Sequence, residues 1–360
     1  MLTFKYIAWH YFKYFLIVLL ALVFFMVGFD YMQVSKDLPS SANLVVIYVV
    51  FKSFFAIDMM LPLSLVFGMI ATKVHLIRSN ALVAFYSLGY SKTDILKPFV
   101  IVSGLIVIIY ISLHTTAFAR ADEYSNNIRS SSQFLKPTQN LFFTYEDKYV
   151  YFGHLYPLQE RAEDIRIFTT ETNELKELLV AKEAYYREGY WHIKEAKQMQ
   201  KPKNLSLRSE GIVLNTQYNL QLLKGFRPKI LDQVYEGKVN FTIIDAIDAM
   251  VLLQDQNINI DKIKSALYRM FIHPFFVPSL IVIIFFFVPI SSRFLNVSLF
   301  SFGAILATLI IWAILFMMIE LSNTKTIPSE VGVVLPVVIL FSISLYIWYK
   351  NCSNCHLKES

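Results

Sequence analysis

Residues 73–98 read KVHLIRSNALVAFYSLGYSKTDILKP, a short polar segment between two long apolar runs. Ser79 is expected to cap a short helix, and Gly89 to end it in the left-handed conformation that glycine adopts readily. Ser91 is expected to cap the next helix, with Asp94 as its reciprocal partner in a capping box. The segment therefore predicts two closely spaced helix boundaries between two membrane spans.

The short helix over residues 80–88 carries one apolar stripe, in which Ala81, Leu82, Phe85 and Leu88 recur at helical spacing. A stripe this short builds no core by itself, so it rests either on the bilayer surface or in a groove of another protein. One interpretation is a loop helix that only joins two spans. The other is a coupling helix that docks in a soluble, energy-supplying protein and passes the motion of that protein to the spans.

The composition is that of a polytopic membrane protein. Of the 360 residues, 56% are hydrophobic and 16% are aromatic, and the mean hydropathy is +0.49, which is too apolar for a soluble globular protein. The formal net charge of +6 is modest, and no basic stripe with interleaved aromatic residues occurs, so nucleic acid is not an expected partner. Two cysteines near the C-terminus exclude a disulfide framework.

Six apolar runs are each long enough to cross a bilayer at about 1.5 Å per helical residue. They cover residues 11–29, 44–72, 99–118, 271–290, 297–320 and 331–348. The second run would be roughly 43 Å long as a helix, which exceeds the ~30 Å hydrocarbon thickness. Its first half, with Lys52 and Asp58, is expected to project beyond the membrane or to lie along its surface, and Pro62 is expected to kink the span.

Between the third and fourth runs, short apolar segments alternate with polar residues. Residues 142–145 and 149–152 flank Glu146, Asp147 and Lys148, which predicts a β-hairpin. This spacing predicts an all-β domain, a sandwich or jelly roll of about 100 residues. Further strands are expected at residues 165–169, 178–186, 191–196, 212–217 and 221–225.

The predicted fold class is a membrane α-helical protein with six transmembrane helices and an inserted periplasmic all-β, jelly-roll-like domain. After the strands, Thr242 is expected to cap a helix, with Asp245 in the reciprocal place. The expected parts are three spans with the short helix at 79–89 (1–119), the β domain (120–240), a helical connector (241–270), three further spans (271–350) and a tail (351–360).

Lysine and arginine in the short connections predict the orientation, because cytoplasmic loops carry an excess of both residues. The side opposite the N-terminus has only Lys36 and Lys325. The N-terminus, the short helix and the C-terminus are therefore expected to be cytoplasmic, and the β domain periplasmic. The side of the N-terminus has nine: Lys5, Lys13, Lys73, Arg78, Lys92, Lys97, Arg293, Lys350 and Lys358.

Four ionisable residues interrupt the apolar runs: Asp58, His114, His273 and Glu320. Such groups inside a membrane are candidates for function, but all four lie near predicted span ends, where a role at the head-group level is favoured. No nucleophile stands at a defined spacing from a base, and no G-x-x-x-x-G-K-[ST] loop occurs. The chain is therefore expected not to be an enzyme, and ATP to be hydrolysed by a separate chain.

Cys352, Cys355 and His356 form a C-x-x-C-H pattern, which suits c-type haem attachment or half of a zinc site. Haem attachment requires the periplasmic side, whereas six spans place this tail in the cytoplasm. No second pair of metal ligands is near in the sequence. We favour a basic tail and expect no cofactor and no metal.

Four segments point to one family. They read SNALVAFYSLGYS (79–91), VAKEAYYREGYWHI (180–193), RMFIHPFFVPSLIVIIFFFVPISSR (269–293) and TIPSEVGVVLPVVI (326–339). In their order and spacing, over nearly the whole chain, they resemble motifs of the lipopolysaccharide export permeases of the LptF/LptG family. The strand around Trp191 and the entry IPSEVGVVLP resemble LptG more than LptF.

The resemblance implies a transmembrane permease subunit of an ABC transporter in the inner membrane of a Gram-negative bacterium. Such a subunit extracts lipopolysaccharide from the inner membrane and passes it to a periplasmic bridge. The implied partners are an LptF-like permease, an LptB-like cytoplasmic ATPase dimer, LptC-like and LptA-like bridge proteins, and lipopolysaccharide.

Two alternatives stay open at this point. The chain can be the LptF-like half of the same transporter, or a non-transporting mechanotransmission scaffold, a class that usually has four spans per chain. The strand edge that pairs with the bridge and the type of lipid A also stay open.

The resemblance assigns ATPase docking to the short helix, with Leu82, Phe85 and Tyr86 as the expected anchors. Asn80 stands where family members usually carry glutamate, so it keeps hydrogen-bonding capacity and loses the charge. The implied docking residues are Ser79, Asn80, Leu82, Phe85, Tyr86, Leu88 and Gly89.

For the lipopolysaccharide head group, Lys36 follows the first span, where LptG proteins carry phosphate-contacting lysines. Arg120 and Arg129 follow the third span and are weaker candidates. The competing interpretation of all three is an ordinary interfacial anchor. The apolar faces of spans one and five are expected to line a chamber for the acyl chains.

Overall fold

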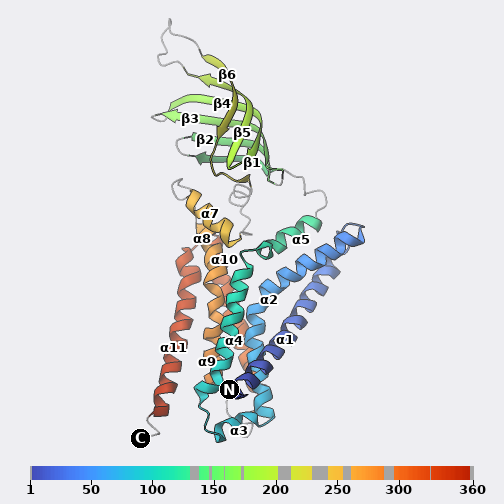
Figure 1. The fold of residues 1–360 in the computed structure, drawn as a ribbon, viewed down its shortest axis with the longest axis vertical. Helices are drawn as coiled ribbons and strands as arrows, with labels where there is room; N and C mark the ends of the chain where they lie inside the picture. The colour runs from blue at the N-terminus through green and yellow to red at the C-terminus, as the bar shows by residue number, and fades with distance from the viewer. Residues whose placement is uncertain are drawn as a thin grey trace. The chain divides into compact units, whose positions relative to one another are not determined.

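The computed structural model describes residues 2–129, 138–145, 148–157, 159–171, 174–201, 212–228, 242–253, 261–287, 296–324 and 326–356. The chain divides into two compact units. A helical unit comprises Met1–Arg129 and Lys264–Ser360, and a sheet unit comprises Ser130–Ile263 (Figure 1). The sheet unit is thus an insertion between two helical halves of the chain.

The described residues of the helical unit form long helices joined by short ones. The helix α8 is included with them, although it begins just before the unit. In chain order the helices are α1 (Leu2–Val34), α2 (Ala42–Arg78), α3 (Ala81–Ser87), α4 (Lys92–Leu113), η1 (Ala117–Arg120), α5 (Ala121–Arg129), α8 (Asp261–Phe271), η2 (His273–Phe275), α9 (Phe276–Phe287), α10 (Val297–Asn323), the π-helix η3 (Glu330–Val334) and α11 (Leu335–His356).

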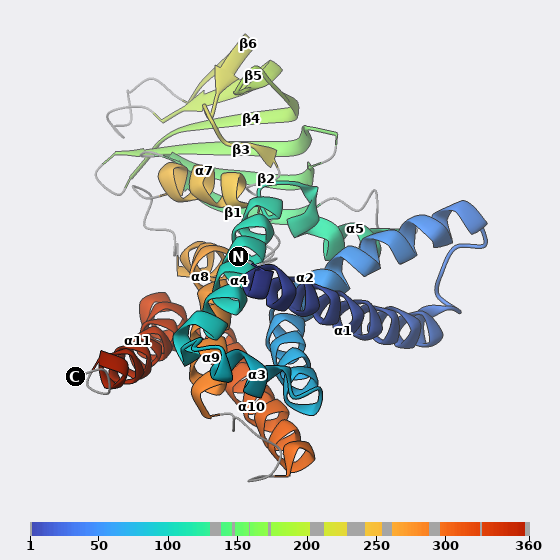
Figure 2. The same cartoon turned by 60° about the horizontal axis from the view of Figure 1, so that its bottom comes forward.

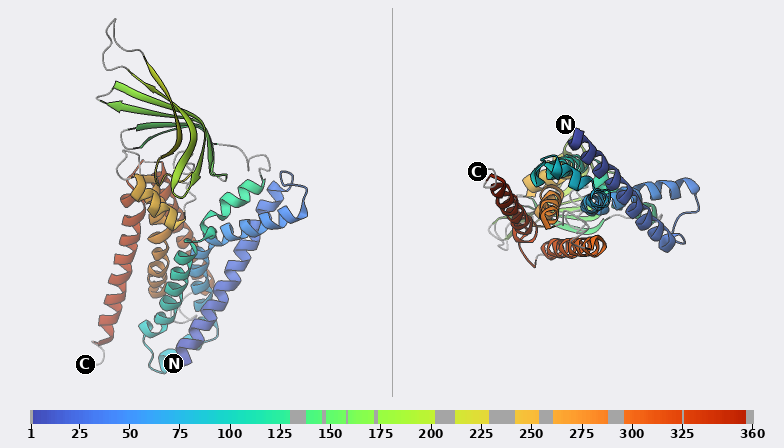
Figure 3. Two further views of the ribbon diagram at one scale, coloured as in Figure 1. Left: turned by 45° about the horizontal axis from the view of Figure 1, so that its top comes forward. Right: turned by 90° about the horizontal axis from the view of Figure 1, so that it is seen from below.

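Six helices of the described chain are long and apolar enough to cross a membrane, which confirms the predicted number of spans. The fourth span begins at Ile263, earlier than expected, because α8 already belongs to it. The start of α1, the end of α11 and the helix α3 lie at the same end of the helical unit (Figures 1 and 3). The spans are Leu2–Val34, Ala42–Arg78, Lys92–Leu113, Ile263–Phe287, Val297–Asn323 and Glu330–Asn351.

The helices α1 and α2 pack along one side of each other. Gly68 of α2 allows a close approach, because a Cβ at this position would lie 2.8 Å from the Cα of Phe15. On the opposite side of α1, Phe24 and Phe25 are each 74% exposed, as suits a surface covered by lipid or by another subunit. The buried face of α1 repeats every fourth residue: Ile7, Tyr11, Phe15, Leu19, Val23 and Val27.

The helix α2 is continuous over 37 residues and runs through Pro62. Its first half, which we expected to project or to lie along a surface, packs against both α1 and α5. The charged residue Lys52 in this half is therefore buried inside the unit.

The sheet unit contains one antiparallel sheet whose strands follow in chain order (Figure 2). This confirms the inserted all-β domain, although the described strands form a simple meander without the Greek-key crossing of a jelly roll. The strands are β1 (Thr138–Tyr145), β2 (Lys148–Tyr156), β3 (Arg161–Glu171), β4 (Glu174–Arg187), β5 (Tyr190–Gln200) and β6 (Val213–Leu222).

Two predicted boundaries of the β domain differ from the structure. The domain was expected to begin at residue 120, but α5 keeps the chain helical up to Arg129, and the sheet unit starts after it. The two strands expected at 212–217 and 221–225 are one strand, β6, because pairing with β5 keeps one register from Val213 to Leu222, apart from Asn219.

The core of the sheet unit is aromatic. Trp191 is fully buried, its ring lies 5.0 Å from that of Phe152, and its Nε1 donates a 2.8 Å hydrogen bond to the carbonyl oxygen of Phe226. Phe143 stacks on Phe226 at 5.2 Å. The segment after β6 is thereby fixed against the sheet.

A helix, α7 (Ile243–Leu253), follows the sheet in the chain. Thr242 Oγ1 accepts a 3.1 Å hydrogen bond from the backbone N–H of Asp245, which confirms the predicted cap. Arg227 forms a 3.2 Å ion pair with Asp248 and so connects α7 to the segment after β6.

Candidate functional site

The segment between α2 and α4 differs from its prediction at the first boundary. Ser79 was expected to cap the short helix, but its hydroxyl donates back to the carbonyl oxygen of His75 at 2.9 Å, and Ser79 is the C-terminal cap of α2. The chain then reverses at Asn80, which has a φ of 57° and makes no side-chain cap. The prediction that Ser79 caps the short helix is therefore wrong. Asn80 instead is the residue at which the backbone reverses before α3.

The other two local predictions are confirmed. Gly89 adopts a φ of 86°, in the left-handed region. The hydroxyl of Ser91 accepts the N–H of Asp94 at 3.1 Å, and the carboxylate of Asp94 accepts the N–H of Ser91 at 3.2 Å. A complete capping box thus starts α4. The helix α3 is held between two well-defined chain reversals.

The inner face of α3 is anchored in the helical unit. Leu82 has no exposed surface and belongs to the hydrophobic core of this unit. Phe85 is half-buried, with its ring edge-to-face to Tyr6 of α1 at 6.1 Å and to Tyr90 at 6.3 Å. Tyr86 is also half-buried, and burial raises its pKa to about 12. Leu82 therefore holds α3 to its own chain. From the sequence we expected Leu82 to anchor a partner protein, but its side chain has no exposed surface.

The outer face of α3 is apolar and exposed. Val83 is 43% exposed and Leu88 is 72% exposed. Arg78 and Lys92 flank this face and are exposed as well. Val83 was missed because it lies off the predicted apolar stripe, of which Leu82 faces the core and Leu88 is exposed. Two apolar faces on so short a helix are the signal that could have identified it.

At the other end of α2, a charged cluster connects three helices. Lys52 of α2 lies 3.3 Å from Asp30 of α1 and 3.5 Å from Asp122 of α5. The hydroxyl of Tyr48 donates to the second carboxylate oxygen of Asp30 at 2.5 Å. The four-residue spacing of Tyr48, Lys52 and the buried Ala56 places them on one buried face, a signal that the sequence analysis did not use.

The three proposed head-group contacts lie in different surroundings. Arg129 of α5 pairs with Asp37 at 2.8 Å. Arg120 is only 9% exposed, so its side chain is not displayed on the surface. Lys36 is exposed and forms no ion pair within the described part of the chain. Of the three, Lys36 presents its charge most openly.

Asp58 and His114 meet inside the helical unit. His114 Nε2 lies 2.9 Å from Asp58 Oδ1, and the hydroxyl of Tyr110 donates to the same carboxylate oxygen at 2.7 Å. His114 is buried, so the expected head-group role does not hold for this pair. The contact instead joins α2 to the end of α4.

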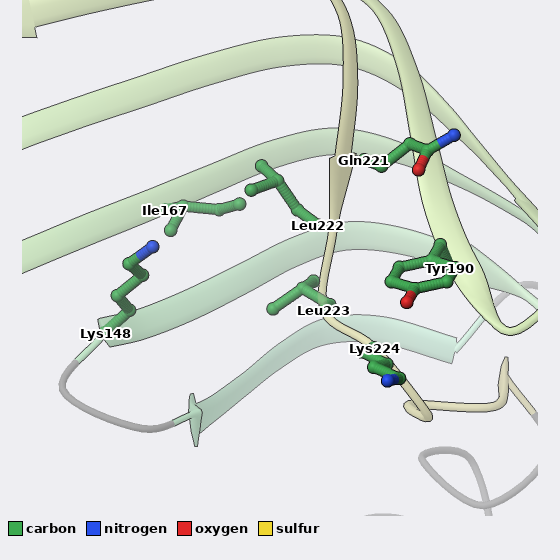
Figure 4. A pocket seen from close by; sticks show the side chains of 7 residues that line it. All are labelled: Lys148, Ile167, Tyr190, Gln221, Leu222, Leu223 and Lys224. Carbon is green, nitrogen blue, oxygen red and sulfur yellow. The ribbon is translucent and has the colours of Figure 1, made fainter.

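The sheet unit has a small open cavity of about 200 Å³. Ile167, Leu222 and Leu223 point toward its middle, and Lys148 and Lys224 lie at opposite sides (Figure 4). This combination of an apolar floor and basic rims suits an anionic amphiphile.

Within the part of the chain that the structure describes, no group of three His, Cys, Asp or Glu side chains could hold a metal ion. The side chains of the C-x-x-C-H pattern lie outside the described residues. The interpretation of that pattern therefore stays a prediction.

Comparison with known proteins supports one family. The model of the family described as lipopolysaccharide export system permease LptF/LptG matches residues 5–350, which include all six spans and the inserted sheet. No curated protein sequence matches the chain. The family match indicates a transporter subunit rather than an enzyme. The chain therefore belongs to the LptF/LptG family and is a multi-pass inner-membrane permease of the lipopolysaccharide export system.

Proposed function

We propose that this permease is the LptG-like half of an ATP-driven exporter and that α3 is the coupling helix on which a cytoplasmic ATPase acts. The observation that carries the proposal is the division of α3 into two faces. Leu82 fixes the inner face in the core, while Val83 and Leu88 leave an exposed apolar outer face. An element held from one side and free on the other can pass a push from a partner to the spans.

The sequence supplies the orientation and the need for a partner. By the sequence, nine basic residues fall in or near the connections expected on the side of α3 and two on the other side, which favours a cytoplasmic position for α3 and both termini. The chain has no phosphate-binding loop, so the energy of ATP has to come from another subunit.

The charge of the outer face suggests what the ATPase groove is like. Arg78 and Lys92 flank Val83 and Leu88, and no Asp or Glu occurs from residue 73 to residue 93. We expect an apolar groove with an acidic rim, because unlike charges at an interface rim guide docking. Asn80 takes no part in a charge pair here.

The substrate side of the proposal rests on Lys36 and on exposed apolar helices. Lys36 is exposed and forms no ion pair within the described residues, so of the three head-group candidates it could reach a lipid phosphate most directly. Exposed apolar side chains of α1 and α10, such as Phe24 and Phe302, could line a chamber for acyl chains together with a second permease.

The sheet unit offers a docking edge for a periplasmic bridge. In the described chain β6 is a terminal strand of the sheet, and Leu214 and Tyr218 on one face are 69% and 68% exposed. An open edge with exposed apolar side chains favours pairing with a strand of another chain. We therefore propose β6 as the edge that pairs with the LptC-like bridge.

The alternatives make different predictions. Six spans argue against the mechanotransmission scaffold, which usually has four. For the LptF-like alternative, the deciding observation is the identity of the second permease that co-purifies with this chain. A co-purified permease closer to LptG would assign the present chain to the LptF position.

Site-specific photocrosslinking in cells tests the proposal, with the probe at Val83, Leu88 or Lys36 in turn. A probe at Tyr346 of α11, which is exposed on a different helix, is the matched control. We expect Val83 and Leu88 to crosslink to an ATPase and Lys36 to lipopolysaccharide. An ATPase adduct without any lipid adduct would favour the scaffold, and the absence of both would contradict the proposed function.

A further inference from the structure

Lys73 is a buried lysine near the inner end of α2. Only 3% of its surface is exposed. Its ammonium donates a hydrogen bond to the carbonyl oxygen of Phe285 and lies 3.6 Å from the centroid of the Phe285 ring. Within the described residues no carboxylate pairs with the ammonium of Lys73. Its hydrogen bond and its ring contact both come from Phe285 of α9.

These contacts compensate for burial in a specific way. The described part of α9 reaches Phe287, and position 289, whose N–H would bond the carbonyl of Phe285 within a helix, is a proline without an N–H. A carbonyl without a partner in its own helix carries a partial negative charge, which a cation stabilises. The ring of Phe285 adds a cation–π contact. Lys73 therefore supplies a donor to the Phe285 carbonyl from a neighbouring helix.

Phe285 lies at a junction of four helices. Its ring is 5.8 Å from that of Phe99 of α4, which in turn is 5.2 Å from that of Tyr11 of α1. All three rings are buried, and Lys73 adds α2 to the group. Densely packed interiors transmit displacements because they have little free volume.

The position of Lys73 relates this junction to α3. Beyond Lys73, α2 continues for little more than one turn to Arg78, and α3 begins at Ala81. A displacement of α3 that moves the inner end of α2 therefore has to carry α9 with it or break the Lys73 contacts.

We propose that Lys73 is a positioning residue for coupled transport: it clamps the inner end of α2 to α9 at Phe285, so that motion imposed on α3 reaches the fourth span. This inference rests on the proposed function, because it takes α3 as the site where the ATPase acts. Lys73 touches neither ATP nor lipid in this role.

The test uses the full complex, purified through a tag on this chain and reconstituted with lipopolysaccharide. Lys73→Met removes the ammonium and keeps the chain length, Lys73→Arg keeps a cation, and Phe285→Leu removes the ring. Lys13→Met, at an exposed lysine of α1, is the matched control. The quantity measured is the lipid extracted per ATP hydrolysed, together with the amount of bound ATPase.

We expect Lys73→Met to lower the lipid extracted per ATP by about tenfold, within the usual range of coupling between sites, without loss of bound ATPase. Phe285→Leu is expected to lower it by about threefold through loss of the cation–π contact. Lys73→Arg is expected to restore part of the loss, and Lys13→Met to change nothing.

A second readout separates positioning from simple stabilisation. Spin labels at Ser87 of α3 and at Phe275 of η2, directly before α9, report the distance across the clamp. The labelled parent complex is first shown to retain its bound ATPase. We expect nucleotide binding to change the distance between the labels in this parent, and we expect Lys73→Met to abolish that change. A purely structural Lys73 would reduce the yield of folded complex and leave the distance change intact.

Unchanged lipid extraction per ATP in both Lys73→Met and Phe285→Leu would overturn the inference. If Lys73→Met gives no folded complex, the lipid extracted per ATP hydrolysed by Phe285→Leu tests the inference, and an unchanged value overturns it. A parent complex that contains no ATPase or extracts no lipid contradicts the proposed function instead. The two failures are therefore distinguishable.

Discussion

The two ends of α2 bury the same residue type in different ways. In the N-terminal half of α2, Lys52 lies between the carboxylates of Asp30 and Asp122. Near the C-terminal end of α2, Lys73 contacts a backbone carbonyl and a phenyl ring, both from Phe285, and no carboxylate among the described residues. The charge of the first lysine is balanced by two carboxylates, and that of the second by a carbonyl dipole and an aromatic ring.

This difference indicates different roles. Removal of Lys52 would leave two partly buried carboxylates facing each other, so its cluster fixes α1, α2 and α5 firmly together. Removal of Lys73 would leave the carbonyl of Phe285 without this donor. A contact of moderate strength near α3 is suited to transmitting motion, whereas a strong one near α5 is suited to a fixed point.

The largest expected effect is that of Lys52→Met. It leaves Asp30 and Asp122 without their shared cation, and breaking such a pair costs about 3 kcal/mol of unfolding free energy or more. Denaturant unfolding of the purified chain in detergent measures the loss, with Lys13→Met as the control. The double variant Lys52→Met/Asp122→Asn should recover part of it. Equal stability of Lys52→Met and the control would remove the distinction between the two ends of α2.

Lys73→Met is expected to cost less, about 1–2 kcal/mol, because methionine fills the space and the losses are one hydrogen bond to a carbonyl and one cation–π contact. The same unfolding measurement places it beside Lys52→Met. A loss as large as that of Lys52→Met would show that Lys73 is a structural fixed point like its counterpart.

The next effect concerns the reversal directly after α2. Asn80 has a φ of 57°, a conformation that asparagine and glycine tolerate and β-branched residues do not. Asn80→Val is expected to cost about 1–2 kcal/mol, and Asn80→Gly a few tenths at most. Unfolding curves of the two variants provide the comparison. Equal losses would mean that the side chain of Asn80, and not its backbone conformation, matters.

The smallest effect is expected for an exposed pair in the sheet unit. Lys201 lies 2.7 Å from Glu174, and this hydrogen bond and charge lower the pKa of Glu174 below its ordinary value. A carboxyl whose pKa is lower in the folded than in the unfolded protein stabilises the folded state at pH values above its unfolded pKa. This contribution disappears as the pH falls through the pKa of the folded state.

Lys201→Met should therefore weaken the protein slightly near neutral pH and not at all in strong acid, and salt should reduce the difference. Unfolding at about pH 7 and about pH 2 measures it. Lys194→Met, at an exposed lysine of the same sheet, is the control. A difference that persists in acid would contradict the assignment to Glu174.

Local signals in the sequence were reliable where the partners lie close in the chain. The capping box of Ser91 and Asp94, the left-handed Gly89 and the cap at Thr242 were all predicted and are confirmed. The prediction for Ser79 failed because a serine hydroxyl between two helices can accept a backbone N–H of the following helix or donate to a carbonyl oxygen of the preceding helix. Which one it does depends on where the chain reverses.

The sequence alone determined the number of spans, the insertion of a β domain between the third and fourth, and the polar segment that contains α3. Hydropathy, alternation and short-range capping act over a few residues, so they can be read along the chain. Only the tertiary structure decided that Leu82 faces the core and that Val83 faces outward.

The tertiary structure also decided the partners of the two buried lysines, since Lys52 and Asp122 are 70 positions apart and Lys73 and Phe285 are 212 apart. Contacts over such separations depend on how helices pack, and hydropathy along the chain contains no information on them.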